Sequence, residues 1–186
     1  DLSSIDQSQK SVTDAKSILG SEAPSRARQL LKAGDVIVST VRPNLNGVAP
    51  VCARLNGATA STGFCVLRPS ADRVLSSYLM HWVRSPKFVE LMVRQATGAS
   101  YPAVSDRIVK ASKIPLPPLP EQRRIAAILD KADALRRKRR QALDLLDSLT
   151  QSIFLEMFGD PAVNPRGFPI MPFGRVGKLD RGVSKH

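Results

Sequence analysis

The stretch LPPLPEQRRI, residues 116–125, decides the fold, because it marks where a proline-rich segment gives way to one long helix. A proline disrupts the interior of a helix but is compatible with its first turn, where the missing N–H has no intrahelical partner. Neither glycine nor proline occurs between Pro120 and Gly159. The sequence therefore predicts a helix over residues 120–158, which would be about 57 Å long at 1.5 Å per residue.

Apolar side chains recur along this predicted helix at the a and d positions of a heptad repeat. The residues expected at the apolar seam include Ile125, Ile128, Leu135, Leu146, Leu149 and Ile153. A solitary helix with one apolar face is unstable in water, so we expect a partner helix. The sequence predicts no other long helix, which favours a partner helix from outside this chain. Packing of the helix on its own domain is the alternative.

The chain is strongly basic, with a formal net charge of +12, which indicates a polyanionic partner. Nucleic acid is the first candidate and an anionic membrane surface the second. The absence of an 18-residue apolar run and of a signal-peptide pattern predicts a soluble, cytoplasmic protein. Cys52 and Cys65 have apolar neighbours and no metal-ligand spacing, so we expect buried reduced thiols.

The residues before the long helix predict an α+β domain with mostly aliphatic apolar residues. Residues 1–25 are polar and are expected to form a loop with at most one helical turn. The β-branched runs at residues 35–41, 48–55 and 61–67 are separated by turn signals, among them Asn-Gly pairs, and predict a small three-stranded meander.

Short helical segments are expected to follow and to pack on this sheet. The first covers residues 70–84, and Ser85-Pro86 predicts the N-cap and first position of the second. Ser105 is expected to cap one further turn, and residues 112–116 read as an edge strand because of their proline. Beyond the long helix, residues 159–167 form a linker and residues 168–186 resemble the beginning of another domain.

No catalytic constellation is visible in the sequence. His81 is expected to be structural and His186 is terminal, and no phosphate-binding glycine loop, paired carboxylates or Ser-His-Asp set has a supporting context. We therefore expect a protein without catalytic residues, metal or cofactor.

Side chains suited to DNA occur in three places. Arginine pairs with guanine and asparagine with adenine, whereas basic tail residues suit phosphate contacts. The candidates are Arg42, Asn44 and Asn46 in one loop, Ser100, Tyr101 and Arg107 in or near another, and Arg181 and Lys185 in the tail. Ordinary turn chemistry is the alternative for Asn46. The basic cluster at residues 136–140 encircles the long helix, and either an acidic protein partner or phosphate would suit it.

The run from Ile114 to Pro161 resembles the conserved helical spacer of type I restriction–modification specificity subunits. The shared signature is Ile-Pro-Leu-Pro-Pro at residues 114–118, then Glu121-Gln122, Ile125 and a long helix that ends at Phe158-Gly159-Asp160-Pro161. Residues 34–37, 66–69 and 98–102 are similar to the later half of the target recognition domain of this family, and residues 168–182 to its opening.

This resemblance implies a non-catalytic subunit that reads one half of a bipartite site in double-stranded DNA. Residues 1–119 would be the later part of a recognition domain, 120–158 the spacer, and 159–186 the linker and opening segment of a recognition domain. The implied partners are methylating and restriction subunits, and the implied location is the prokaryotic nucleoid. The single spacer suggests a half-size, circularly permuted or fragmentary form that works as an antiparallel homodimer. A stand-alone basic coiled-coil DNA-binding or regulatory protein is the alternative.

Overall fold

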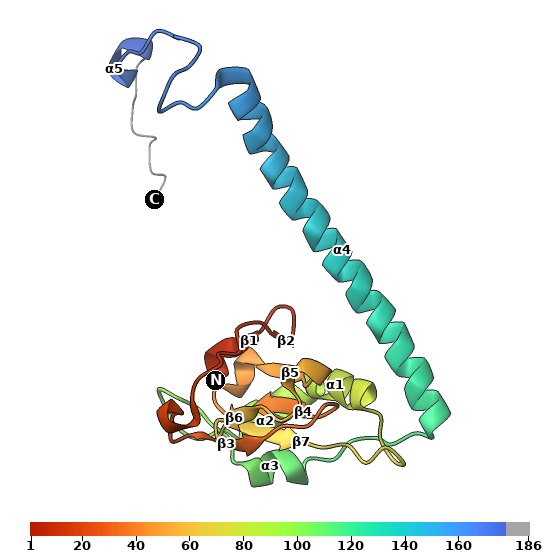
Figure 1. Cartoon of the computed structure of the whole chain (residues 1–186). Coiled ribbons are helices and arrows are strands. Elements are labelled where there is room, and N and C mark those ends of the chain that lie inside the picture. The colour runs from red at the N-terminus through yellow and green to blue at the C-terminus, as the bar shows by residue number, and fades with distance from the viewer. Residues whose placement is uncertain (178–186) are drawn as a thin grey trace, which may run out of the picture. The chain divides into compact units, whose positions relative to one another are not determined.

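The computed structural model describes residues 1–177, which belong to two compact units, residues 1–135 and a second unit that begins at Arg136 (Figure 1). The first unit combines short antiparallel strands with short helices, so the predicted α+β class is confirmed. The long helix α4 (Leu119–Phe158) begins in the first unit and continues into the second.

The central strand of the first unit is β4 (Val36–Ser39), and all four of its residues are buried. It pairs antiparallel with β5 (Val48–Pro50) on one side and with β7 (Phe64–Leu67) on the other. The strand order β5-β4-β7 is not the predicted meander, which would have placed β7 beside β5. Pro50 has no N–H for a ladder, and β5 ends there.

The segment that follows β5 explains the departure from a meander. It forms the 3-10 turn η4 (Ala53–Leu55) and then β6 (Thr59–Ser61), which pairs with β3 (Ala27–Leu30) in a separate two-stranded sheet. The expected strand over residues 48–55 is therefore only three residues long. The chain therefore passes through the β3–β6 sheet before it returns to the central sheet as β7.

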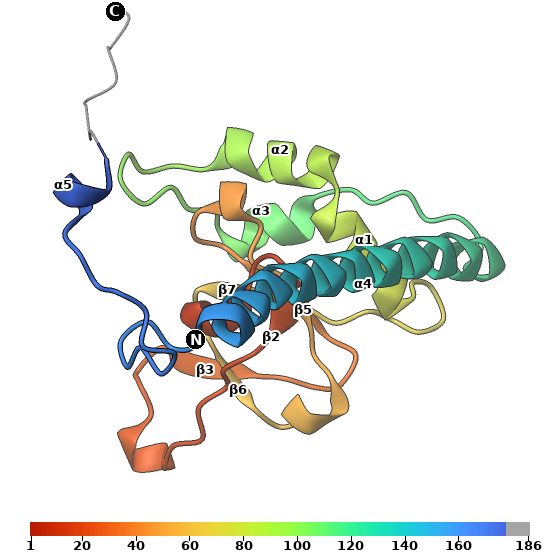
Figure 2. The same cartoon turned by 90° about the horizontal axis from the view of Figure 1, so that it is seen from above.

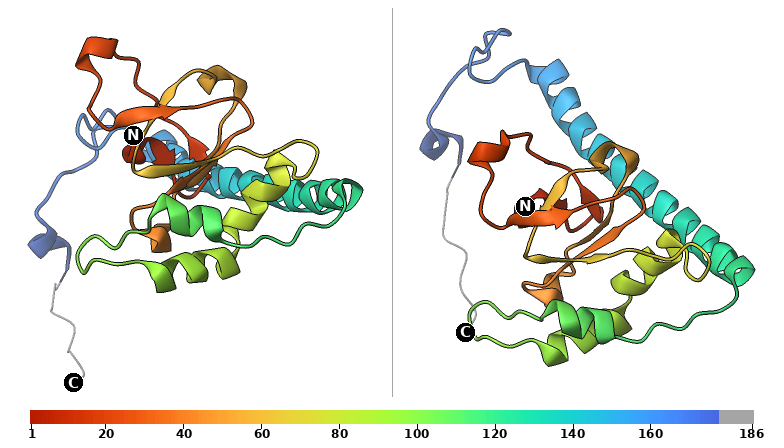
Figure 3. Two further views of the ribbon diagram at one scale, coloured as in Figure 1. Left: turned by 90° about the horizontal axis from the view of Figure 1, so that it is seen from below. Right: turned by 60° about the horizontal axis from the view of Figure 1, so that its bottom comes forward.

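Both faces of the central sheet are covered, because successive side chains of β4 point to opposite sides. Val36 and Val38 belong to an apolar cluster with side chains of α1 (Ser76–Arg84), α2 (Pro86–Gln95) and α3 (Asp106–Ala111). Ile37 belongs to a second cluster with Phe64 and residues of the β3–β6 layer. Figures 2 and 3 show the short helices on one side of the sheet and the β3–β6 layer on the other.

The predicted helix caps are confirmed. The Ser85 hydroxyl accepts a hydrogen bond from the Phe88 N–H at 3.3 Å, and Pro86 occupies the first turn of α2. The Ser105 hydroxyl accepts from the Ile108 N–H and begins α3. Helix α1 begins at Ser76, six residues later than predicted, after a turn in which the Val74 N–H donates to the Ser70 carbonyl.

Two predictions about extended segments were wrong. Residues 1–25 are not a plain loop: η1 (Leu2–Ser4) precedes a hairpin of β1 (Ile5–Asp6) and β2 (Ser11–Val12), and η2 (Gly20–Glu22) follows. The hairpin forms because Ile5 is buried in the second cluster while the Asp6 carboxylate accepts the N–H groups of Ser8 and Gln9 in the turn. Residues 112–116 have no regular secondary structure and join no ladder in the described chain.

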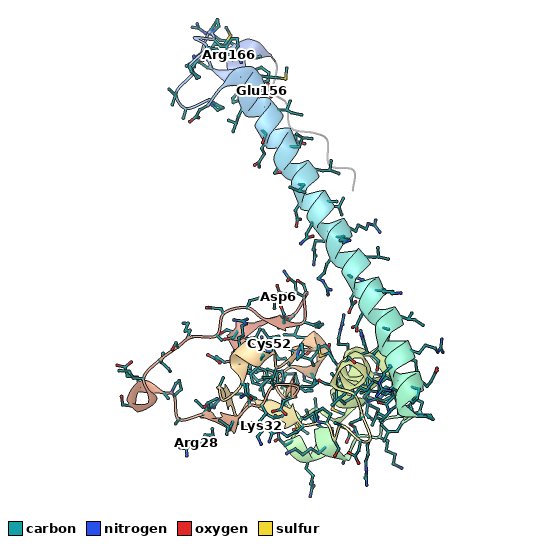
Figure 4. All side chains as sticks on the ribbon, turned by 45° about the vertical axis from the view of Figure 1, so that its right-hand side comes forward. Asp6, Arg28, Lys32, Cys52, Glu156 and Arg166 are labelled. Carbon is teal, nitrogen blue, oxygen red and sulfur yellow. The ribbon has the colours of Figure 1, made fainter. Side chains whose placement is uncertain are left out.

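The two cysteines occupy different environments. Cys65 on β7 is fully buried, and burial raises the pKa of its thiol to about 11. The prediction of burial was wrong for Cys52, which is exposed at the start of η4 because β5 has already ended at Pro50 (Figure 4).

The second unit contains the later turns of α4, a loop and the short helix α5 (Phe173–Val176). Arg166 donates to the Glu156 carbonyl of the helix, and both residues are labelled in Figure 4. The Phe158 and Phe168 rings are 6.2 Å apart between centroids. Among the described residues of this unit the large apolar side chains are exposed, so it has no core of its own.

Candidate DNA interface and helix anchor

The loop after β4 presents the first predicted DNA-contacting residues. It contains the 3-10 turn η3 (Pro43–Leu45), flanked by Arg42 and Asn46, which both have the left-handed backbone conformation. This conformation is uncommon outside glycine and fixes the direction in which each side chain leaves the loop. Arg42 and Asn44 are exposed.

A second loop, residues 97–103, is held against the first. The Arg42 N–H donates to the Pro102 carbonyl at 2.7 Å, and Ala103 forms isolated bridges with Val41 and Thr97. The Arg42 guanidinium lies 4.6 Å from the centre of the Tyr101 ring. Stacking on an aromatic ring orients a guanidinium while its N–H groups stay available.

Gly98 makes the turn of this second loop possible. Its φ is +101°, and a Cβ at this position would lie 3.0 Å from the Tyr101 carbonyl oxygen. Ser100 and Tyr101 are exposed on the resulting turn. The fold therefore brings Arg42 and Tyr101, which are far apart in sequence, into one cluster on the first unit.

Asn46 has a structural role in this loop. Its side-chain amide donates to the Val83 carbonyl at the end of α1, at 2.8 Å, and its own carbonyl accepts from Lys10 Nζ at 2.6 Å. Burial, and then the nearby positive charge of Arg84, lower the pKa of Lys10. These contacts agree with the alternative of turn chemistry at Asn46.

The remaining predicted DNA residues are not brought into this cluster by any described contact. Arg107 is exposed on α3, and Arg181 and Lys185 lie outside the described residues. The sequence analysis did not identify Ser3 and Gln7, which line a shallow pocket beside Arg42 and Tyr101. Both come from the N-terminal segment, whose polar composition alone gave no signal of a site.

The anchor of α4 is Gln122, a fully buried polar residue. Its side-chain oxygen accepts from the Leu75 N–H at 3.0 Å, and its side-chain nitrogen donates to the Arg73 and Pro117 carbonyls, each at 2.8 Å. Gln122 thus joins the loop that precedes α1 to the loop that precedes α4. Sequence reasoning placed it in the family signature but assigned it no task.

Polar pairs continue this attachment along α1. The His81 ring nitrogen Nε2 lies 2.9 Å from a carboxylate oxygen of Asp130, and Arg84 pairs with Asp133. The Tyr78 hydroxyl donates to the Pro115 carbonyl at 3.0 Å. The first turns of α4 are therefore fixed to α1 chiefly by hydrogen bonds and charge, and His81 has the structural place that the sequence predicted.

The attached face and the predicted seam lie on different sides of α4. At 3.6 residues per turn, the direction shared by Gln122, Ala126, Asp130 and Asp133 is about 160° from the mean direction of the seam. Ile125 lies between the two faces and is half-buried, whereas the other seam residues are exposed. Their exposed fractions are 52% for Ile128, 68% for Leu135, 59% for Leu146, 51% for Leu149 and 45% for Ile153.

Comparison with known proteins decides the family. The family model described as "Type I restriction modification DNA specificity domain" matches residues 7–145. The chain belongs to this family. The match covers residues 7–135 of the first unit and α4 as far as residue 145, and so includes the anchor, the two loops and part of the seam.

Relatives support this assignment at moderate identity. The HindI specificity subunit of Haemophilus influenzae is 25% identical over 141 residues, which cover 75% of this chain and 31% of the relative. The EcoDI specificity subunit of Escherichia coli is 26% identical over 129 residues, with 67% and 28% covered. The chain thus spans about a third of the length of these relatives.

Solved structures show the same fold. The HsdS subunit from Thermoanaerobacter tengcongensis is 39% identical, with a TM-score of 0.65, over 92% of this chain and 44% of that one. A chain from a structural study of complex assembly and conformational transition of the type I restriction–modification system is 38% identical, with a TM-score of 0.68 and the same coverage. Within the part of this chain that the structure describes, no helix is long and apolar enough to cross a membrane.

Proposed function

We propose that this chain is a DNA-specificity element of a type I restriction–modification complex, without catalytic activity of its own. Its first unit reads one half of a bipartite site in double-stranded DNA, and α4 holds that reader at a fixed distance from a second one. Residues 1–119 act as the later part of a recognition domain, 120–158 as the spacer, and 159–186 as the linker and opening segment of a recognition domain.

The observation that carries this proposal is that α4 has two separate faces in a chain of this family. One face of its first turns is anchored to the first unit through Gln122, which attaches the start of the helix to the reader. The other presents an exposed apolar seam that suits a second helix. A reader attached to the start of a helix that pairs along its length is what a molecular ruler requires.

The partner of the seam in this proposal is a second copy of the chain, packed antiparallel. Two-fold symmetry then places two equivalent readers on a pseudopalindromic site. Methylating subunits, and restriction subunits with them, join the complex. The basic cluster at residues 136–140 gives these proteins or the DNA phosphates a positively charged surface.

For base reading, the proposal places the Arg42–Tyr101 pair with Asn44 and Ser100 at the DNA. Arg42 is presented by a left-handed backbone and a stacked ring, which limits the entropy lost when it reaches a guanine. Arg107, Arg181 and Lys185 remain predicted phosphate contacts. Asn46 is more useful as support for the loop than as a base contact, because its amide already donates within the protein.

Methylation mapping tests this proposal. The chain is co-expressed with the methylating subunit of a type I system, and modified sites are sequenced across the host DNA. We expect one bipartite motif with a fixed spacer. Arg42→Ala should relax one base position, at a cost of about 1–3 kcal/mol in discrimination, whereas Arg26→Ala, an exposed arginine on the same unit, should leave the motif unchanged.

Two results would contradict the proposal. A contiguous motif without a spacer would exclude the ruler, and methyl transfer by the isolated chain would exclude a non-catalytic role. An unchanged motif in Arg42→Ala would reject the assignment of the base-reading loop alone.

A further inference from the structure

A groove on the first unit lies between α2 and the extended segment 112–116. One wall is a single face of α2, formed by Lys87, Leu91 and Gln95 at spacings of four residues. The opposite wall is the end of α3 and the segment that follows it, including Ile108, Lys113 and Ile114. No residue of this groove belongs to the Arg42–Tyr101 cluster, so its role is separate from base reading.

Trp82 of α1 also lines this groove and carries an unmet hydrogen-bond donor. Its indole Nε1 is buried and has no hydrogen-bond partner among the described residues. A buried donor without an acceptor costs about 1–3 kcal/mol. An acceptor in the groove would recover this cost only when the indole ring turns, because Nε1 has no exposed surface in this structure.

The segment 112–116 offers further unused hydrogen bonds. Ser112 leaves α3 in an extended conformation with φ −66° and ψ 139°. The backbone N–H and C=O groups of Lys113 and Ile114 pair with no other group in residues 1–177. An extended backbone with free polar groups is the template to which another extended segment adds as a strand.

The charge and polarity of the residues that line the groove indicate what kind of molecule it can bind. The lining contains Lys87 and Lys113 but no carboxylate, while Leu91, Ile108 and Ile114 supply apolar surface. Two positive charges at the rim of an apolar floor favour an apolar side chain flanked by acidic residues. A phosphate backbone would gain little from the apolar floor.

We propose that this groove binds an extended segment of another polypeptide, with a central apolar side chain and acidic flanks, added alongside residues 112–116. The backbone of the segment pairs with Lys113 and Ile114, and one of its carbonyl groups accepts the Trp82 N–H after the indole ring turns towards the groove. The acidic flanks meet Lys87 and Lys113.

Trp82 is the only tryptophan of the chain, so its fluorescence reports on this groove alone. The probe is an acetylated and amidated peptide of about seven residues, with leucine and valine in the centre and glutamate on both sides. The whole chain is titrated with this peptide at moderate salt. We expect a saturable change in the Trp82 emission and none with a peptide in which lysine replaces glutamate.

Variants locate the binding surface. Lys87→Glu combined with Lys113→Glu should weaken binding of the acidic peptide at least about tenfold and favour the lysine peptide, because rim charges set partner choice. Lys16→Glu, an exposed lysine outside the groove, should bind like the parent. Trp82→Phe, followed by calorimetry, should weaken binding about tenfold through loss of one hydrogen bond, with an unchanged circular dichroism spectrum.

Three results would overturn the inference. The first is an emission that does not change up to millimolar peptide. The second is equal binding by the Lys87→Glu, Lys113→Glu double variant and the parent. The third is a duplex oligonucleotide that produces the same change and displaces the peptide, since the groove would then belong to a nucleic-acid surface.

Discussion

The first and later turns of α4 belong to one continuous helix but differ in an unexpected way. A polar side chain is buried in the first turns, whereas apolar side chains are exposed in the later ones. Gln122, a polar residue near the start, is completely buried, whereas Leu146, an apolar residue in the second half, is 59% exposed. Glutamine is tolerated inside because all of its hydrogen-bonding needs are met by backbone groups of two loops. The exposed leucines of the later turns are not covered by any residue of the described chain, and in the proposed dimer a second helix covers them.

The difference teaches that the two halves of α4 are stabilised by different means. The first turns are held by specific polar contacts inside one unit, and their stability should be independent of protein concentration. In the proposed dimer the later turns gain apolar burial only through association, so we expect their stability to rise with protein concentration.

The largest effect should come from the seam. Leu146→Glu combined with Leu149→Glu places charges where two helices pack, and each lost leucine burial is worth about 1.5–3 kcal/mol. With two sites on each helix we expect a loss of about 6 kcal/mol, which raises the dissociation constant about ten-thousandfold. Sedimentation equilibrium should show a dimer for the parent and a monomer for the variant.

The control for the seam places the same charges off it. Gln141→Glu combined with Ser148→Glu alters exposed positions of the same helix, so the dimer should persist. A parent chain that is strictly monomeric at micromolar concentration would rule out pairing between copies.

The second effect should come from the anchor. Gln122→Ala leaves the Leu75 N–H and the Arg73 and Pro117 carbonyls without their partner, and we expect a loss of about 3 kcal/mol in the free energy of unfolding. Urea unfolding of the first unit, followed through Trp82, measures it. Gln141→Ala, on the exposed surface of the same helix, should stay within about 0.5 kcal/mol of the parent. Equal stability of the two variants would contradict the anchor.

A smaller effect should come from Asp35, a buried carboxylate at the start of β4. Arg68 donates to it from Nε at 2.8 Å and from Nη2 at 2.7 Å, and the Lys32 N–H donates at 2.8 Å. Burial opposes its ionisation, but these hydrogen bonds prevail and lower its pKa below the ordinary 3.8. Asp35→Asn should cost about 2 kcal/mol at neutral pH through loss of charged hydrogen bonds.

The pH dependence of Asp35 has a definite sign. A carboxylate with a lowered pKa stabilises the fold fully above its ordinary pKa, and this contribution is lost as the pH falls through the lowered value. The parent should therefore lose stability below about pH 4 more steeply than Asp35→Asn, as urea unfolding across that range would show.

The exposed pair Glu121–Arg124 at the start of α4 provides a contrast, since Glu121→Gln should leave the free energy of unfolding without measurable change. Parallel pH profiles for the parent and Asp35→Asn would disprove this account.

The smallest perturbation uses the thiols. The thiolate is the reactive form, and burial keeps Cys65 protonated with a pKa of about 11, whereas Cys52 is exposed. A thiol reagent at pH 8 should label one cysteine rapidly in the folded chain and both after unfolding. Cys52→Ser should abolish the rapid reaction. Rapid labelling of Cys65 in the folded chain would indicate that strand β7 readily separates from the residues that bury this thiol.

Much of the local structure could be predicted from the sequence. The start and end of α4, the caps at Ser85 and Ser105 and the central strand β4 were all anticipated within a few residues. The helix ends and caps depend on interactions among residues close in the chain, such as a hydroxyl that accepts the N–H three residues later, and β4 is indicated by a short run of β-branched residues. The family resemblance was also visible, because the proline-rich start of α4 is a local motif.

The errors share one physical cause. The hairpin of β1 and β2, the order β5-β4-β7 and the exposure of Cys52 all depend on which distant segments meet. The Arg42–Tyr101 contact joins residues that lie in separate loops, and sequence reasoning could name both loops without pairing the two side chains. Residues 112–116 have a strand-like sequence, but a strand needs a neighbour that the described chain does not supply.

By itself, then, the sequence determined a long helix with an apolar seam, an α+β domain before it and a strongly basic charge. The elements follow from periodicity and from the positions of proline and glycine, and the charge follows from composition. Only the tertiary structure decided that Gln122 anchors the helix, that the seam faces away from the anchored side and that Arg42 stacks on Tyr101. Local backbone preferences are set by neighbours in the chain, whereas burial and pairing are set by neighbours in space.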